Sequence, residues 1–391
     1  MTGFRQSWRG APEVKPVLLL VGPFPPPYGG IANITAQLAG SDLNDAFRIV
    51  PVNVNLPSEE TENTSGKKRV NLWKAARLYL VLTKALLSTR PAAAIVEMNG
   101  DKSCFREMIA SFFIRLSTRA TVVTHFHGGM SQRSAWRTFP FSRKSAETFS
   151  GRFFLNLCFS FSHHVACLSR HLVEDMRPFL SRRVGAKLAI VENFVVTRDF
   201  RPHEDPRDGR TRVLFMGRLS LAKGFFDLLQ AIPGVAEKHP GVVFWACGAP
   251  ETSQSLDGVN DLIRDFEAKG WLRLLGIVKG EQKQVIYARA DILACPSHGD
   301  VFPVTLLEGL AQGLPIVTTR VGDIPYLVTE PENVLFTEKG CISSLVDGLL
   351  FLLENPEVRK TMGLANRTLA RARFDIDVAT SRFRGLLSTP P

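Results

Sequence analysis

The chain alternates short apolar runs with stretches that carry helical spacing, and this alternation constrains its fold more than any other feature. In the first half, the apolar runs have the length and the flanking Gly and Pro residues of buried strands. These expected strands cover residues 17–22, 94–97, 120–126, 165–168 and 189–192. Strands that alternate with helices form parallel βαβ units, so the first half is predicted to be a doubly wound α/β domain.

The same pattern starts again after a polar segment. Residues 197–211 are rich in Pro and in charged side chains, and we interpret them as a linker between two domains. The expected strands of the second half cover residues 213–217, 242–248, 272–276, 292–295 and 316–319. Doubly wound sheets bind ligands at the carboxyl ends of their strands, so two such domains face to face would enclose a ligand cleft.

Charge is distributed unevenly between the two halves of this 391-residue chain. Residues 1–200 hold 26 Lys and Arg against 14 Asp and Glu, whereas residues 201–391 hold 22 against 23. A basic half beside a neutral half indicates an anionic partner for the first half only. The candidates are nucleic acid, an anionic membrane surface and a lipid that carries a diphosphate-linked sugar.

The cysteine and hydropathy patterns indicate where the protein works. The six cysteines are scattered and form no C-x-x-C pair, which argues against a metal knuckle and a disulfide framework and favours a reducing cytosol. No stretch reaches the ~18 uninterrupted apolar residues that a spanning helix needs, and the N-terminal residues lack the apolar region of a signal peptide. We therefore expect a cytoplasmic protein.

The stretch over residues 296–317 says most about function. It places two acids, Asp300 and Glu308, eight positions apart, with an apolar run between them and a Gly-x-Pro entry into the next strand. The pattern predicts Asp300 in a loop and Glu308 in the first half of a helix over residues 306–312. Both carboxylates would then face one crevice, where each can accept hydrogen bonds from adjacent sugar hydroxyls.

This stretch resembles the acid-x7-acid signature of the retaining glycosyltransferases of family 4 (glycosyl transferases group 1), in particular bacterial polysaccharide-assembly members. The first acid is Asp where the family usually has Glu, and Val301 stands where Gly is usual. The resemblance is densest over residues 212–325. It implies the GT-B fold of two Rossmann-like domains facing across a cleft. The acceptor-side domain would cover residues 1–196 plus a C-terminal helix in 373–391, and the nucleotide-sugar domain residues 197–372.

A second run that could bind a ligand covers residues 217–224, at the end of an expected strand. Its Arg218 offers a planar pair of donors and its Lys223 a movable point charge, so the two side chains can hold two phosphate groups. The run resembles the family's Gly-Arg-x5-Lys-Gly diphosphate site, in which both residues contact the leaving nucleoside diphosphate.

The resemblance implies further contacts with the donor. His127 would lie at the donor sugar, whereas His125 is expected on the opposite face of its strand as a core histidine. Gly29 and Gly30 would permit positive φ and close approach to a ligand. For Asn193, two roles stay open: a contact with the ligand, or a turn residue without one. The full set of expected donor-site residues is Gly29, Gly30, His127, Arg218, Lys223, Ile277, Val278, Asp300, Phe302, Pro303, Val304 and Glu308.

The implied reaction is a metal-independent sugar transfer with retention, catalysed through His127, Arg218, Lys223 and Asp300. The two cations would stabilise the negative charge on the departing diphosphate, so neither a metal nor a cofactor is expected. Asp300 would hold hydroxyls of the sugar and Glu308 those of the ribose. Backbone groups at residues 277–278 would pair with the base, which leaves a UDP-sugar and a GDP-sugar both open as the donor.

Two stretches of the basic half combine aromatic and basic side chains, at residues 69–80 around Trp73 and 136–144 around Trp136. Such surfaces suit contact with anionic lipid. We therefore expect a lipid-linked or saccharide acceptor, reached by peripheral contact with the inner face of the plasma membrane, in exopolysaccharide, capsule or lipopolysaccharide assembly. Two alternatives stay open: a GT-B sugar-nucleotide epimerase, and a non-catalytic sugar-nucleotide or nucleic-acid binder. Nucleic acid is not the expected partner, because the chain lacks an RNA-binding motif.

Overall fold

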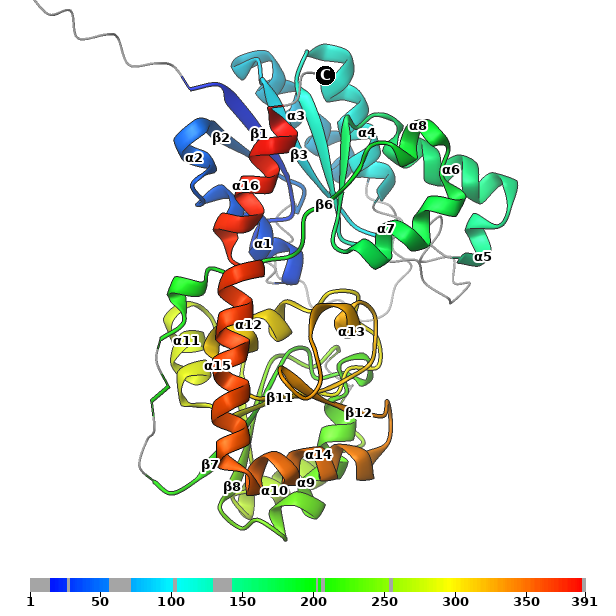
Figure 1. Cartoon of the computed structure of the whole chain (residues 1–391). Coiled ribbons are helices and arrows are strands. Elements are labelled where there is room, and N and C mark those ends of the chain that lie inside the picture. The colour runs from blue at the N-terminus through cyan, green and yellow to red at the C-terminus, as the bar shows by residue number, and fades with distance from the viewer. Residues whose placement is uncertain are drawn as a thin grey trace, which may run out of the picture.

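The computed structural model shows two parallel sheets with helices on both faces of each (Figure 1). It describes residues 15–26, 29–55, 72–100, 104–128, 143–201, 203–204, 208–252 and 256–388. This architecture confirms the predicted class of two Rossmann-like doubly wound domains.

The first sheet has the strand order β2-β1-β3-β4-β5-β6. The strands are β1 Val17–Gly22, β2 Arg48–Asn53, β3 Ala93–Met98, β4 Thr121–Phe126, β5 His164–Cys167 and β6 Leu188–Ile190. The helices are α1 Gly30–Ala39, α2 Leu43–Ala46, α3 Leu72–Thr89, α4 Cys104–Ser117, α5 Arg143–Ala146, α6 Phe149–Ser160, α7 Arg170–Met176 and α8 Arg182–Gly185. Every residue of β1, β3 and β4 is buried, because helices cover both faces.

The second sheet has the order β12-β11-β10-β7-β8-β9. Its strands are β7 Thr211–Met216, β8 Val242–Cys247, β9 Leu272–Gly276, β10 Ile292–Cys295, β11 Ile316–Thr319 and β12 Val334–Thr337. Its helices are α9 Phe225–Ala236, α10 Asn260–Ala268, α11 Gly280–Arg289, α12 Val304–Gln312, α13 Ile324–Leu327, α14 Ile342–Glu354 and α15 Pro356–Arg373. The last helix, α16 Ile376–Leu387, packs on the first domain, where Phe383 joins a cluster with Leu18 and Ile34.

The two strands that sequence analysis did not predict both lie at a sheet edge. β2 contains Arg48, Pro51 and Asn53 and is largely solvated, so it lacks a continuous apolar run. β12 is four residues long. Short, half-solvated edge strands carry a weaker hydropathy signal than central strands, because only part of their surface is buried.

The chain passes between the domains twice at one place. Val195 and the Phe374–Ile376 segment exchange backbone hydrogen bonds, with both N···O distances 2.9 Å. Beside this crossing, Arg373 and Arg382 bond the carboxylate of Glu192. In Figure 1, α15 and α16 follow each other along one side of both domains, so the C-terminal segment links the two sheets.

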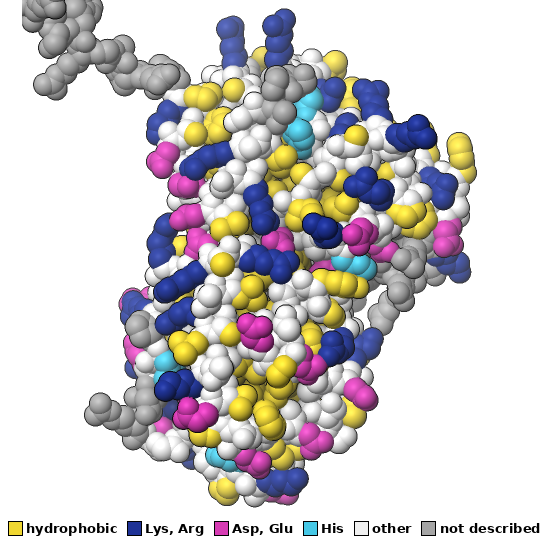
Figure 2. Space-filling model, in the orientation of Figure 1, with side chains coloured by type: hydrophobic (Ala, Val, Ile, Leu, Met, Phe, Trp, Pro, Cys, Tyr) yellow, Lys and Arg dark blue, Asp and Glu magenta, His cyan; other side chains and the backbone are white. Residues whose placement is uncertain are grey.

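Basic side chains gather on the first domain in the face drawn in Figure 2, and acidic side chains are more frequent over the second. This agrees with the charge balance of the two halves of the sequence.

Candidate active site

Several of the expected donor-site residues lie along the carboxyl edge of the second sheet. Ile277 follows β9, Arg218 follows β7 and Asp300 follows β10. In the sheet, β8 separates β9 from β7, and β7 and β10 are neighbours. The expected contacts to base, diphosphate and sugar therefore succeed one another along a single edge. Ile277 is exposed there, and Val278 packs into the core beneath.

Lys223 and Asp300 meet in this edge as an ion pair. Lys223 is about one third exposed and Asp300 less, so both side chains remain within reach of solvent. Arg218 lies further out, with 60% of its side chain exposed, and pairs with Glu251 at 3.3 Å. Sequence analysis predicted that Lys223 contacts phosphate and that Asp300 contacts sugar hydroxyls. In the structure the two groups form an ion pair with each other.

Gly224 fixes the loop that carries Lys223. It adopts a left-handed φ of +75°, and a Cβ at this position would stand 1.8 Å from the carbonyl oxygen of Pro296. The backbone N–H of His298 donates to the carbonyl of Ala222 at 3.0 Å. The Lys223 loop and the Asp300 loop are therefore packed backbone to backbone, and this contact brings the two charges together.

Glu308 is buried on α12 and held by two residues of α11. Lys283 pairs with its Oε1, and the hydroxyl of Tyr287 donates to Oε2 at 2.8 Å. Burial, followed by the neighbouring Glu308, raises the pKa of Tyr287 well above its usual value, so the phenol stays protonated and able to donate. Sequence analysis missed Lys283 and Tyr287. Their spacing of four places them on one face of α11, but nothing in the sequence connects that face to Glu308.

A thiol at the end of β10 indicates how closely these charges gather. Burial raises the pKa of Cys295 to about 12, with smaller electrostatic effects from Lys223, Asp300 and Glu308. All three charges thus lie within electrostatic reach of one buried atom. A further pair, His298 and Asp227 at 2.5 Å, was also missed from the sequence.

The first domain meets this edge at the start of α12. A Cβ built on Gly30 would lie 3.7 Å from the side chain of Val304. Phe302 and Pro303 precede Val304, and the carbonyl of Phe302 accepts from Nδ2 of Asn193 at 3.1 Å. Asn193 therefore contacts the other domain.

The two loop glycines do not adopt the positive φ that glycine permits. Gly29 is extended, with φ of −163°, and Gly30 begins α1. A Cβ on Gly29 would meet nothing within 4 Å. At this position the lack of a side chain leaves open space next to the helix N-terminus and relieves no backbone strain.

His127 follows β4 in the first domain. The prediction that its neighbour His125 is a core histidine is confirmed, because its side chain is fully buried and hydrogen-bonded, but the prediction that it points to the opposite face from His127 is wrong. The two residues are two positions apart, and side chains of an extended strand repeat every two residues, so both point to the same face. Their ring centroids are 4.2 Å apart, and both rings bond the buried carboxylate of Glu97 on β3. Glu97 was missed because no motif surrounds it.

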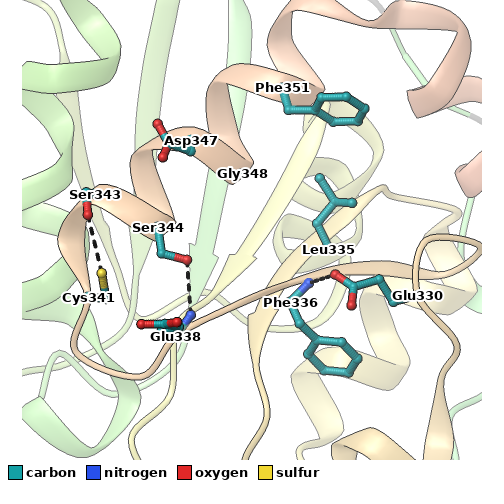
Figure 3. Close-up of a pocket in the computed structure, with 10 residues that line it drawn as sticks. All are labelled: Glu330, Leu335, Phe336, Glu338, Cys341, Ser343, Ser344, Asp347, Gly348 and Phe351. Atoms are coloured by element: carbon teal, nitrogen blue, oxygen red, sulfur yellow. Dashed lines mark hydrogen bonds between the residues drawn. The ribbon is translucent and has the colours of Figure 1, made fainter.

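A separate hollow of about 470 Å³ opens between β12 and α14 (Figure 3). It is lined by Glu330, Leu335, Phe336, Glu338, Cys341, Ser343, Ser344, Asp347, Gly348 and Phe351. Hydrogen bonds within the wall occupy several of its polar groups: Phe336 N–H donates to Glu330 at 2.8 Å, and Glu338 N–H to Ser344 at 3.1 Å. None of the expected donor residues lines it, so we do not assign it to the active site.

Comparison with known proteins supports this description of the second domain. Residues 196–368 match the family model "Glycosyl transferases group 1". A glycogen synthase of Mycobacterium tuberculosis is 27% identical over 170 residues, which are 44% of this chain and 40% of that protein. The chain thus aligns with less than half the length of this curated relative.

Solved structures match over both domains. Sucrose-phosphate synthase from Thermosynechococcus elongatus has a TM-score of 0.73 at 15% identity, covering 95% of this chain and 98% of that one. Anabaena HepE in complex with UDP-glucose has a TM-score of 0.70 at 18% identity, covering 95% and 99%. At these identities the likeness shows the fold. The chain therefore has the GT-B fold, and its residues 196–368 are similar to the glycosyl transferases group 1 family.

Proposed function

We propose that this protein is a retaining glycosyltransferase of family 4 that moves a sugar from a nucleoside-diphosphate sugar to a hydroxyl acceptor. One observation carries the proposal. Ile277, Arg218 with Lys223, and Asp300 follow one another along the carboxyl edge of the second sheet. This order matches the order of base, diphosphate and sugar in such a donor. The relatives named glycogen synthase and the HepE complex with UDP-glucose support a sugar nucleotide as the ligand.

The Lys223–Asp300 ion pair suggests how the donor would enter. A diphosphate competes with the carboxylate for Lys223, and a sugar that arrives with it offers hydroxyls to the released Asp300. Lys223 would exchange the carboxylate for the diphosphate, and Asp300 would exchange the ammonium for sugar hydroxyls. Neither charge would be left without a partner, which keeps the free-energy cost of breaking the ion pair low. Glu308, held between Lys283 and Tyr287, would accept from the ribose hydroxyls.

The reaction would proceed on the front face of the sugar. The acceptor oxygen forms a bond to the anomeric carbon while the bond from that carbon to the phosphate oxygen breaks. The acceptor proton passes to the departing phosphate. Arg218 and Lys223 would stabilise the charge that develops on the diphosphate, so we propose that no metal or cofactor is required.

We further propose a lipid-linked saccharide acceptor at an anionic membrane. The support is an apolar ridge on the first domain, formed by exposed side chains of α3, α4 and α6. Its members are Leu80, Leu87, Ile109, Phe112, Phe113, Leu116, Phe149 and Phe153. The single acid of these three helices is Glu107, which is buried and paired with Arg106, whereas Lys84, Arg115 and Arg152 are exposed. Anionic lipid complements this apolar and basic surface.

Of the two expected aromatic stretches, only Leu80 of residues 69–80 contributes to this support. Trp136 and the Trp73 side chain lie outside the described residues. Among the helices that the structure describes, none combines the length and apolar character that crossing a membrane requires.

Donor binding can be tested by thermal shift with UDP-, GDP- and ADP-sugars, because a ligand at 100 times its Kd stabilises a protein by ~2.7 kcal/mol. Transfer is then tested by release of nucleoside diphosphate on adding lipid-linked saccharides, with and without EDTA. We expect release that depends on the acceptor and survives the chelator. Conversion of the donor without acceptor would favour an epimerase, and binding without product a non-catalytic protein. Loss of activity that Mg²⁺ restores would contradict the metal-free mechanism.

A further inference from the structure

A buried triad of titratable side chains lies at the carboxyl edge of the first sheet. Glu97 and His125 are register partners on β3 and β4, and His127 follows β4. The side chains of Glu97 and His125 are fully buried, and that of His127 is 3% exposed. Phe383 of α16 packs against the His125 ring, with centroids 5.1 Å apart. The triad therefore lies inside the first domain, and His127 is its outermost member.

Space for the triad is provided by a glycine. A Cβ at Gly22 would stand 2.7 Å from Cγ of Glu97 and 3.2 Å from Cγ2 of Thr35. A larger residue at the end of β1 would displace the carboxylate. The absence of a side chain at Gly22 thus allows Glu97 to turn towards the two histidines.

The hydrogen-bond partners determine which ring nitrogens carry protons. Nδ1 of His125 is 3.0 Å from Oε2 of Glu97, and Nε2 is 3.3 Å from the carbonyl oxygen of Val191. The carboxylate of Glu97 accepts only, so Nδ1 of His125 donates to it. Nε2 of His127 bonds the same Oε2 of Glu97, again as a donor. No hydrogen bond of the described residues occupies Nδ1 of His127.

Electrostatics agree with this assignment. Burial would favour the protonated acid, but the two neighbouring imidazoles outweigh it and hold the pKa of Glu97 at about 2. Burial, and then the nearby His125, lowers the pKa of His127. A neutral His127 that donates through Nε2 has a lone pair on Nδ1. That atom can only accept a hydrogen bond.

We propose that Glu97 and His125 are positioning residues that hold His127 as a neutral imidazole, with its Nδ1 lone pair available to a hydroxyl of the sugar substrates. The inference deepens the proposed transfer and rests on it for the identity of the ligand. Glu97 fixes the tautomer, and His125 keeps Glu97 ionised and in place. Oε1 of Glu97, buried with no hydrogen-bond partner among the described residues, is consistent with a carboxylate retained for this purpose.

The tautomer can be measured without substrate or activity. Long-range ¹H–¹⁵N spectra of protein labelled with ¹⁵N-histidine distinguish a protonated ring nitrogen from one with a lone pair. At pH 7 we expect His127 to carry its proton on Nε2. A proton on Nδ1 of His127 would overturn the proposal, whatever the outcome of the transfer assay.

The Glu97→Gln variant tests whether the Glu97 carboxylate determines the tautomer of His127. Its amide can donate to Nε2 of His127, which would move the proton to Nδ1. Glu107→Gln is the matched control, because it also neutralises a buried carboxylate but lies on α4. We expect the tautomer of His127 to change in E97Q and not in E107Q. An unchanged tautomer in a folded E97Q would contradict the proposal. If E97Q does not fold, Glu97→Asp, which keeps the charge, should retain the wild-type tautomer, and a switch there would count against the proposal equally.

Kinetics give a second readout. We expect E97Q to lower kcat/KM about 10–100-fold, the range found for partners that orient a histidine. In a His127→Ala background the same change should have no further effect, because the residue that it positions is absent. Independent, additive losses would indicate a merely structural carboxylate. The ligand atoms of the triad all lie within 4.8 Å of one another, so the spectra are repeated with Zn²⁺. Bound zinc, with both histidines deprotonated at the metal, would also overturn the proposal.

Discussion

At the scale of single residues, the charged groups of the second domain are held in pairs. Lys223 with Asp300, Lys283 with Glu308 and His298 with Asp227 each combine one basic and one acidic side chain. Under the proposed function, such pairs would hold the donor-binding side chains in position. The Lys223–Asp300 pair also makes activity and stability separable, because it is partly exposed and such a pair contributes little to stability.

Lys223→Ala is the first test of that separation. Lost stabilisation of transition-state charge typically costs about 10²–10³-fold in turnover. The free energy of unfolding should change little, since Lys223 is about one third exposed. Turnover and urea unfolding are measured together, with Lys238→Ala, an exposed lysine beyond the other end of α9, as the control. Near-wild-type turnover in K223A would remove Lys223 from the diphosphate site.

His163 supports a prediction about pH. Its Nδ1 accepts from the backbone N–H of Val122 at 2.9 Å, and burial, followed by Arg115 and Lys187, lowers its pKa to about 4. The unfolded chain, with a pKa near 6.5, binds this proton more readily. The stabilisation from His163 is therefore complete above about pH 6.5 and is lost as pH falls towards 4.

His163→Asn should flatten this dependence, because the amide oxygen can accept from Val122 but does not titrate. Urea unfolding at pH 7.5 and pH 5 measures how the free energy of unfolding of each protein depends on pH. We expect the wild type to lose more stability than H163N between the two pH values. Equal losses would show that other groups account for the acid sensitivity.

The sequence predicted the elements that carry the candidate site residues found in local runs. Arg218, Lys223, Asp300 and Glu308 belong to such runs, and each lies on the expected element. Lys283 and Glu97 could not be found in this way. Their partners are 25 and 28 or more positions away in the chain, and only the packing of helices and strands brings them together.

At the scale of elements, the central strands and their carboxyl-terminal loops were predictable, because buried parallel strands are continuous apolar runs. Edge strands β2 and β12 were not, since β2 is largely exposed and β12 is only four residues long. Loop conformation was only partly predictable. The sequence marks glycines, but only the structure distinguishes Gly224, which has a left-handed φ, from the extended Gly29.

These two glycines give a paired prediction. Gly224→Ala should destabilise the protein by at least about 1–2 kcal/mol, the usual cost of a left-handed non-glycine residue, and more because the new Cβ meets Pro296. Gly29→Ala meets no atom and should unfold like the wild type. If substrate occupies the open space, G29A will still lose activity. Thermal unfolding and turnover of both variants decide this, and a destabilised G29A or an unperturbed G224A would contradict the description of these loops.

At the scale of the whole molecule, the two domains are tied at the paired crossing segments. Val195 and the Phe374–Ile376 segment bond each other there, and Glu192 accepts from Arg373 and Arg382. The sequence indicated two sheets, but how they face each other depends on contacts between residues about 180 positions apart. The apolar ridge is also a property of the whole domain. Its members come from three helices and form a surface only when α3 and α6 pack on either side of α4.

The last prediction concerns that ridge. Leu87 and Leu116 are 79% and 72% exposed. Lys84 lies three residues before Leu87, and Arg115 directly precedes Leu116. Each basic residue near an anionic surface contributes ~1 kcal/mol, and each inserted leucine ~1.5–3 kcal/mol. We therefore expect Leu87→Ser with Leu116→Ser to weaken binding to anionic vesicles by at least about tenfold, since 1.4 kcal/mol corresponds to one factor of ten.

Co-sedimentation with anionic and neutral vesicles at low and high salt measures this binding. Leu364→Ser is the control, because Leu364 is 64% exposed but lies on α15 of the second domain. Salt should release much of the protein, since charges are screened beyond ~8 Å at physiological ionic strength. The fraction that stays bound should be the one lost in the double leucine variant. Equal and negligible binding to both kinds of vesicle would leave the ridge without a lipid partner, and a soluble acceptor would then replace the lipid-linked one.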